Sequence, residues 1–393
     1  PFIICPKAVM STWAQVCNFF KIVPLSIVNY ETVKSGKYYD VNNKRVNCNY
    51  INVSCYDDID IKFEWKLPRN SIIIFDEVHK CRNKNTLNGK LLLSTIDQWK
   101  VLLLSGTIAD KPESFHIFGY MLGFYKNIRQ ANNWIKGMIR EDRACLDYNK
   151  NNKLSAIHKQ IYPEKGSRMR IVELGNKFPE NQVSAECYYI SEKHRIQVNE
   201  AFTKINEYDI NLKSALSKND NAQILKELTK ARQALELIKV PIIKDLVESY
   251  TENGCNVVIF VNFTETIHKL SAVLGGIDCI INGERSVEEI KENIEKFQDN
   301  KCNIIICNSS MIEGISLHDL HGVPRVSLIS PPRGSTQLIQ NIGRISRAGA
   351  KTPALQRLIY CAGTCEEVIC NRLKEKLKFL SKLNDNDLID IKS

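Results

Sequence analysis

Two neighbouring carboxylates that follow a hydrophobic run are the strongest chemical signal in the sequence. The run Ser71–Phe75 leads directly into Asp76 and Glu77, and His79 stands two residues further on. A buried strand ending here would place both carboxylates at the carboxyl edge of a parallel sheet, where α/β proteins bind ligands. An aspartate there can hold Mg²⁺ through water, and the glutamate can orient or deprotonate an attacking water. The alternative, an acidic strand end that only caps a helix, is disfavoured by the apolar run and by His79.

The pattern of a strand followed by a polar turn occurs again further along the chain. The apolar run Val101–Leu104 precedes Ser105, Gly106 and Thr107. The two hydroxyls could hydrogen-bond the acidic pair and sense a bound nucleotide. An ordinary strand-to-loop turn explains this piece equally well when it is taken alone.

A pair of arginines in the last part of the chain could meet a phosphate. Arg344 and Arg347 have a spacing that predicts a shared helical face. Two guanidiniums on one face can clamp a γ-phosphate and stabilise its charge as it transfers. A basic surface helix is the alternative, and it is made weaker by Gln340 ahead of the pair and by the glycines Gly343 and Gly349.

A polar loop upstream of the arginines is a candidate contact for a nucleic-acid backbone. The apolar run Cys302–Cys307 opens into Ser309 and Ser310, whose hydroxyls and backbone amides could meet a phosphodiester oxygen. Contacts of this kind position a nucleic-acid strand without identifying its bases. A plain loop is the alternative interpretation.

Composition bounds the class of protein and of partner. The chain has 393 residues, a formal charge of +10 and 14 cysteines. The excess of positive charge suits a polyanionic partner. The cysteines stand singly with no CxxC pair, so we expect no zinc but buried thiols of a reducing, intracellular compartment. No apolar run approaches membrane-spanning length, so no membrane partner is expected.

Short apolar runs without alternation predict strands buried on both faces, as in parallel sheets covered by helices. The runs cluster at the two ends of the chain, which predicts an α/β fold with two lobes. The predicted segments are a first lobe at 1–110, a mainly helical insertion and linker at 111–175, and a second lobe at 176–393. Helical periodicity at about 192–237 predicts a protrusion from the second lobe, in which Lys218–Asn221 would form the turn of a helical hairpin.

Together and in this order, the pieces resemble the motifs of superfamily-two helicases, specifically the Swi/Snf group of duplex-DNA translocases. The segment Phe2–Trp13 resembles motif Ia, and Asp76–His79 resembles motif II. The remaining matches are Leu104–Thr107 with motif III, Val258–Asn262 with motif IV, Glu313–Leu317 with motif V and Gln340–Gly349 with motif VI. Any one match is weak, whereas the ordered set covers nearly the whole chain.

The resemblance implies two RecA-like lobes that bind ATP with Mg²⁺ between them and act on nucleic acid, duplex DNA more than RNA. It implies that Asp76 holds the metal through water, that Glu77 activates water and that the arginines reach across from the second lobe. The implied catalytic set is Asp76, Glu77, His79, Arg344 and Arg347. Residues implied to couple to ATP are Ser105, Gly106, Thr107, Gly314, Gln340 and Gly343. Residues implied to contact nucleic acid are Pro6, Lys7, Arg168, Arg170, Asn262, Ser309 and Ser310.

The sequence also departs from the family pattern. Ile108 and Asp110 stand where the family usually has proline and asparagine, and Glu313 stands where the group often has glycine. No glycine-rich phosphate loop ending in Gly-Lys-Ser or Gly-Lys-Thr occurs, and the family places that loop before motif Ia. We therefore expect the chain to begin partway through the first lobe and to hydrolyse ATP poorly by itself. Strand unwinding of RNA or DNA, and a nucleic-acid-binding platform without hydrolysis, are the alternatives to translocation on duplex DNA.

Overall fold

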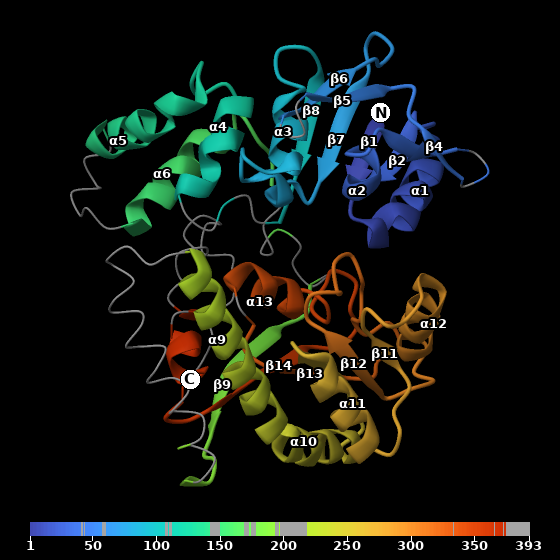
Figure 1. The fold of residues 1–393 in the computed structure, drawn as a ribbon. Coiled ribbons are helices and arrows are strands. Elements are labelled where there is room, and N and C mark those ends of the chain that lie inside the picture. The colour runs from blue at the N-terminus through green and yellow to red at the C-terminus, as the bar shows by residue number, and fades with distance from the viewer. Residues whose placement is uncertain are drawn as a thin grey trace. The chain divides into compact units, whose positions relative to one another are not determined.

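The chain separates into two compact units, one covering residues 1–168 and the other beginning at residue 169. The computed structural model describes residues 1–40, 42, 44–56, 60–106, 109, 112–141, 150–168, 173, 178–192, 196, 218–332, 334–364, 366–371 and 373–374. Each unit is built around its own parallel β-sheet (Figure 1). The predicted α/β fold with two parallel-sheet lobes is thus confirmed.

The first unit is centred on four parallel strands in the order β2-β1-β7-β8. They are β1 (Phe2–Cys5), β2 (Ser26–Asn29), β7 (Ile72–Asp76) and β8 (Lys100–Leu104). Strand β1 buries all of its side chains, and β7 buries Ile73 and Phe75 fully while Ile72 and Ile74 are half-buried. Because all four strands are parallel, their carboxyl ends lie at one edge of the sheet, which is where Asp76 stands.

Two antiparallel hairpins and a set of helices complete the first unit. The hairpins pair β3 (Lys37–Tyr39) with β4 (Arg45–Asn47), and β5 (Ile51–Tyr56) with β6 (Asp60–Trp65). The helical elements before β8 are η1 (Lys7–Val9), α1 (Met10–Phe19), α2 (Tyr30–Val33), η2 (Val78–Cys81) and α3 (Leu87–Leu93). Those after β8 are η3 (Pro112–Phe115), α4 (His116–Met121), η4 (Ile128–Gln130), α5 (Ala131–Glu141) and α6 (Lys150–Ile161). This last group lies within the first compact unit.

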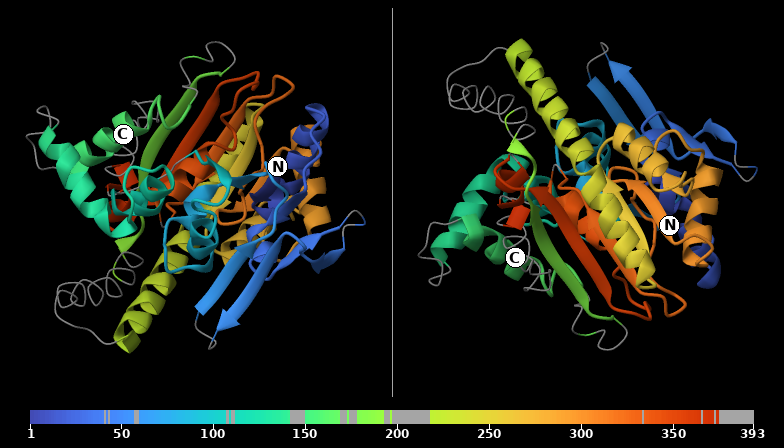
Figure 2. Two further views of the ribbon diagram at one scale, coloured as in Figure 1. Left: turned by 90° about the horizontal axis from the view of Figure 1, so that it is seen from above. Right: turned by 90° about the horizontal axis from the view of Figure 1, so that it is seen from below.

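The second unit holds six parallel strands in the order β11-β12-β10-β13-β14-β9. They are β9 (Asn181–Tyr188), β10 (Asn256–Val261), β11 (Ile280–Ile281), β12 (Ile304–Asn308), β13 (Arg325–Ile329) and β14 (Ala354–Cys361). Figure 2 shows β9 beside β14, which pair along eight residues although they are far apart in sequence. The helices are α9 (Lys218–Ile238), α10 (Val240–Glu252), α11 (Thr264–Val273), α12 (Val287–Gln298) and α13 (Ser335–Ile342).

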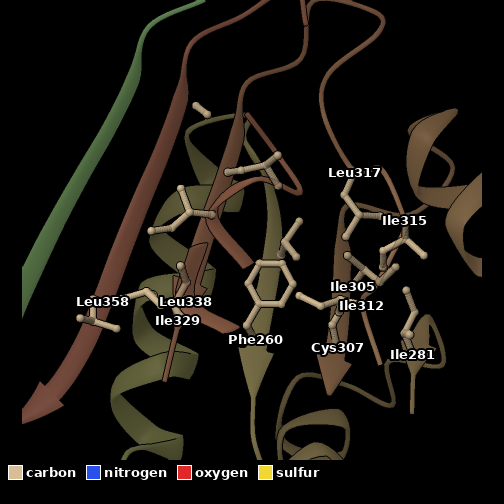
Figure 3. Packing of buried hydrophobic residues seen from close by; sticks show 14 of the residues in the cluster. Phe260, Ile281, Ile305, Cys307, Ile312, Ile315, Leu317, Ile329, Leu338 and Leu358 are labelled. Atoms are coloured by element: carbon tan, nitrogen blue, oxygen red, sulfur yellow. The ribbon is translucent and has the colours of Figure 1, made fainter. Parts of the chain in front are cut away.

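Alternate residues of each strand feed two apolar layers, one on each face of the second sheet. Phe260 of β10 packs with Phe297 of α12 and Leu338 of α13 on one face, part of which Figure 3 shows. On the other face, Ile259 packs with residues of α10 and α11, including Ile243. The even distribution of buried Ile, Val and Leu over both faces explains why these strands appear in the sequence as continuous apolar runs.

The predicted turn of a helical hairpin at Lys218–Asn221 is wrong. These four residues form the first turn of α9 instead. Asparagine and aspartate favour a helix start as well as a turn, because their side chains can satisfy the amides that a helix start leaves unpaired. The part of the predicted protrusion at 193–195 and 197–217 lies outside the described residues.

Candidate functional site

The side chain and backbone of Asp76 are held by three hydrogen bonds at the carboxyl end of β7. Trp13 Nε1 donates to Asp76 Oδ2 over 2.8 Å, and the backbone amide of Glu77 donates to Oδ1 over 2.9 Å. The hydroxyl of Tyr30 donates to the Asp76 carbonyl oxygen over 2.8 Å. Trp13 belongs to α1 and Tyr30 to α2, so the two helices that follow β1 and β2 both orient this aspartate.

The Asp76 carboxylate suits a metal-bound water. Burial raises the pKa of Asp76, the hydrogen bond from Trp13 lowers it, and the nearby charge of Glu77 raises it. The net direction is upward from the usual aspartate value. Each carboxylate oxygen accepts one hydrogen bond here and has a second lone pair to offer. The two carboxylate oxygens of Asp76 therefore fit the role expected for this residue, which is to hold Mg²⁺ through water.

Glu77 and His79 lie next to each other at the start of η2. Glu77 has a φ of 53°, a left-handed backbone conformation that is uncommon outside glycine, asparagine and aspartate. His79 Nδ1 lies 3.2 Å from Glu77 Oε2 and 3.3 Å from Ser105 Oγ. His79 therefore connects Ser105 at the end of β8 with Glu77 of the acidic motif. Gly106 is exposed directly after Ser105, and Thr107 lies outside the described residues.

The expected nucleic-acid contacts of the first unit differ in exposure. Pro6 is buried, whereas Lys7 is exposed where β1 ends and η1 begins. Arg168 is half-buried, and its guanidinium carbon lies 6.0 Å from the centre of the Tyr162 ring. Arg170 lies outside the described residues. Lys7 is therefore the residue of this set best placed to meet a phosphate.

The expected shared helical face of Arg344 and Arg347 is wrong. Helix α13 ends at Ile342, and both arginines lie beyond it. Their side chains turn back onto the helix end: Arg344 Nε donates to the Gln340 carbonyl and Arg347 Nε to the Gly343 carbonyl. Basic side chains satisfy the carbonyls that a helix end leaves unpaired. The arginines are nonetheless brought together, because both also donate to the carbonyl of Ile315.

The nucleotide-coupling residues expected in the second unit surround this arginine pair. Gly314 has a φ of 76°, which favours glycine directly before the shared acceptor Ile315. Gln340 is half-buried, and its carbonyl receives Arg344. Gly343 caps the end of α13. The loop after β12 and the end of α13 therefore form one local structure.

Two residues expected to meet nucleic acid have hydrogen-bond partners within the protein. Ser309 is buried, and its hydroxyl accepts from Asn341 Nδ2 over 3.2 Å. The backbone amide and side-chain amide of Asn262 both donate to Glu236. A polar side chain after a strand end can serve the fold or a ligand, and sequence does not distinguish them. Ser310, by contrast, is exposed.

Other residues at these edges were not predicted as functional. Trp13 is part of the motif Ia resemblance, but its hydrogen bond to Asp76 could not be predicted, because it depends on how α1 packs. Arg232 and Glu236 of α9 and Lys239 after it are buried at the carboxyl edge of the second sheet. Charged residues in a helical pattern usually indicate a solvated face, so sequence gave no reason to single them out.

The described part of the chain carries no sign of a metal cluster, a disulfide or a membrane span. No three His, Cys, Asp or Glu side chains gather there as a metal site would require. All the cysteines described are unpaired thiols. None of the helices described has the length and apolar character that a bilayer crossing needs.

Comparison with known proteins identifies the class. Residues 238–349, which include both arginines, match the Helicase conserved C-terminal domain. The chain is 39% identical over 413 aligned residues to a protein named as a putative ATP-dependent RNA helicase of Acanthamoeba polyphaga mimivirus, covering 99% of this chain and 76% of that protein. It is 28% identical over 105 residues to an ATP-dependent rRNA helicase of Encephalitozoon cuniculi, covering 26% of each. The chain therefore belongs to the family of ATP-dependent helicases.

Two solved structures are similar at greater distance. One is the SWI2/SNF2 ATPase core of Sulfolobus solfataricus in complex with dsDNA, with 15% identity, a TM-score of 0.39 and coverage of 100% of this chain and 86% of that chain. The other is S. cerevisiae Dbp5 bound to RNA and ADP BeF3, with 14% identity, a TM-score of 0.48 and coverage of 96% and 75%. Likenesses this distant do not bear on the choice between DNA and RNA.

Proposed function

We propose that this protein is a nucleic-acid-dependent ATPase that moves along its substrate, with duplex DNA preferred over RNA. The observation that carries the proposal is the Asp76–Glu77–His79 group at the carboxyl edge of a parallel sheet, with Asp76 oriented by Trp13. Membership of the ATP-dependent helicases supports ATP as the nucleotide. The motif resemblance to Swi/Snf translocases supports duplex DNA.

In the proposed chemistry, Asp76 would hold Mg²⁺ through water, which would supply positive charge beside the phosphates. Glu77 orients or deprotonates the attacking water. His79 supports Glu77 and connects it to Ser105 at the end of β8. Arg347 stabilises the charge that develops on the transferred phosphoryl group.

RNA unwinding is the second candidate function. It is favoured by the name of the mimivirus relative, which is 39% identical over 99% of this chain. The contacts proposed for either substrate are to phosphates, through Lys7 and Ser310. Phosphate contacts carry no base information, so these residues do not decide between the two substrates.

The test is ATPase activity with matched nucleic acids. We expect duplex DNA to stimulate turnover more than single-stranded RNA of equal length. A strand-displacement assay on duplexes with and without single-stranded tails separates unwinding from translocation. Stronger stimulation by RNA would replace the proposed function with RNA unwinding. Binding without any hydrolysis would favour a binding platform, and an absence of both would refute the nucleic-acid assignment.

A further inference from the structure

Three charged side chains on and directly after α9 are buried in the second unit. Arg232, Glu236 and Lys239 are 7%, 1% and 0% exposed, and their spacing of four and three residues places them along one face. Charged side chains are almost never buried this completely unless each is paired. A helix that only covered the sheet would present apolar side chains, as α10 does with Ile243 and Val247. The charged face therefore has a task beyond covering the sheet.

The two cations of this face hold the ends of adjacent strands. Arg232 Nη2 donates over 2.9 Å to the carbonyl of Pro331, which follows β13. Lys239 Nζ donates over 3.2 Å to the carbonyl of Ile359 in β14 and lies 2.6 Å from Glu366 Oε1. Burial lowers the pKa of Lys239, but the charges of Glu366 and Glu236 and the hydrogen bond to Glu366 together outweigh it, so the pKa is raised. Lys239 is therefore a charged anchor for β14.

Glu236 holds the turn that follows β10. Its Oε1 accepts from the amide nitrogen of Asn262 over 2.8 Å and from Asn262 Nδ2 over 2.9 Å. Its Oε2 accepts from the backbone amide of Phe263 over 3.1 Å and lies 3.1 Å from the amide of Asn262. Three N–H groups of one turn thus converge on a single buried carboxylate. Bonds to an ionised acceptor are stronger than neutral ones, so Glu236 fixes the position of this turn.

The same network continues to an exposed loop. Asn308 at the end of β12 donates from Nδ2 to the carbonyl of Asn262 over 3.5 Å, the longest link. Asn308 Oδ1 accepts from the amide of Ser310 over 3.0 Å and from its hydroxyl over 2.6 Å. Strands β10 and β12 pair with Val261 opposite Asn308, so the two strand ends lie side by side. A hydrogen-bonded path therefore runs from Glu236 through Asn262 and Asn308 to Ser310.

We propose that Glu236 is a positioning residue that sets the Ser310 loop for a phosphate of the bound nucleic acid. The inference rests on the proposed function, because it takes a nucleic-acid backbone as the ligand. Glu236 is only 1% exposed and touches no ligand itself. It acts through Asn262 and Asn308, whose hydrogen bonds connect the Glu236 carboxylate to Ser310. The buried carboxylate thereby links α9 to the surface that binds the substrate.

The test is Glu236→Gln, with binding of labelled duplex DNA and labelled single-stranded RNA measured by fluorescence anisotropy. The substitution keeps the volume but turns one acceptor oxygen into a donor that faces the N–H groups of Asn262 and Phe263. We expect affinity to fall about two- to tenfold, the equivalent of one net hydrogen bond. In Glu236→Gln/Asn262→Asp, the new amide can donate to the new carboxylate. We expect this pair to recover part of the lost affinity, which a general loss of packing would not allow.

Ile243→Val is the matched control for stability. It removes one buried methylene in α10 of the same unit, away from the hydrogen-bonded path. We expect it to lower the melting temperature while leaving nucleic-acid affinity at the wild-type value. Glu236→Gln lowers both. An affinity loss in Ile243→Val equal to that in Glu236→Gln would overturn the positioning role.

Ser310→Ala separates this inference from the proposed function. If Glu236 acts through Ser310, adding Glu236→Gln to Ser310→Ala costs little further affinity. Full additivity of the two losses, or wild-type affinity in Glu236→Gln while Ser310→Ala is weakened, would overturn the inference and leave the proposed function standing. A wild-type protein that binds neither nucleic acid would instead refute the proposed function, and the positioning role with it.

Discussion

Arg344 and Arg347 donate hydrogen bonds to one acceptor, the carbonyl oxygen of Ile315, over 2.9 Å from Arg344 Nη1 and 3.3 Å from Arg347 Nη2. The shared acceptor holds the two guanidiniums together although α13 has already ended. Their surroundings differ, because Arg344 is 5% exposed whereas Arg347 is half-buried. Of the two, Arg347 is therefore the more accessible to a ligand.

Alanine substitution should separate the two arginines. Arg344→Ala leaves the Gln340 carbonyl without its Arg344 donor, at a cost of about 1–3 kcal/mol for a buried group left unsatisfied, and leaves the Ile315 carbonyl with Arg347 only. We expect a fall in melting temperature of about 2–4 °C per kcal/mol in a unit of this size. Arg347→Ala should change the melting temperature less and lower ATPase turnover about 10³–10⁵-fold, as loss of an arginine finger does. Melting curves and ATPase turnover per folded molecule, measured for each variant, check these two expectations. Equal losses of stability with unchanged turnover would mean that both arginines have a structural role only.

Glu77→Gln should abolish most turnover while leaving nucleotide binding in place. Glutamine fits the left-handed backbone at this position as well as glutamate does, so the change removes basicity rather than shape. Loss of a general base costs about 10²–10⁴-fold. Nucleic-acid-stimulated ATPase is the measurement, with Glu64→Gln on the exposed side of β6 as the matched control. Wild-type turnover in Glu77→Gln would remove this residue from the mechanism.

Trp13→Phe should shift the pH dependence of magnesium use. Burial raises the pKa of Asp76 and the Trp13 hydrogen bond opposes that rise, so removing the bond raises the pKa further. A proton competes with a metal-bound water for the ionised carboxylate. The Mg²⁺ concentration needed for half-maximal ATPase should therefore rise as the pH falls through the Asp76 pKa. This rise in the Mg²⁺ requirement should begin at higher pH in Trp13→Phe than in the wild type.

The measurement is the Mg²⁺ concentration for half-maximal ATPase as a function of pH. Trp65→Phe is the matched control, because Trp65 Nε1 donates over 2.8 Å to Ser94 Oγ, away from Asp76. It should cost stability without moving the pH profile. Identical profiles in wild type and Trp13→Phe would mean that Asp76 does not bear on magnesium.

The strands that carry the site could be predicted from sequence because each is a continuous apolar run, which β10 buries on both faces and β7 buries fully on one. β7 and β10 both appear as such runs, and the position of Asp76 at a strand end follows from the first. The hairpin strands β5 and β6 were not predicted, because polar side chains interrupt their apolar ones. Strand β6 buries alternate side chains, Phe63 and Trp65, so it shows no continuous apolar run.

The partners of individual side chains could not be predicted in the same way. Asn262 and Ser309 follow strand ends as ligand-binding residues often do, yet each is engaged by a residue distant in sequence, Glu236 and Asn341 respectively. The burial of Glu236 depends on where α9 packs, which no local pattern encodes. Motif resemblance predicts a site at the carboxyl edges of both sheets, whereas tertiary packing decides which residues at those edges are accessible.

The last prediction concerns Lys7, which is exposed where β1 ends. If Lys7 neutralises one phosphate, the slope of log affinity against log salt should become shallower by about 0.9 on duplex DNA in Lys7→Ala, and by about 0.7 on a single strand. Lys301→Ala is the matched control, because Lys301 is 69% exposed, pairs with Asp299 and precedes the amino end of β12. It should leave the slope unchanged. Because a phosphate contact ignores base identity, the Lys7→Ala loss should be the same on unrelated sequences. An unchanged slope, or a loss confined to one sequence, would contradict a phosphate contact at Lys7.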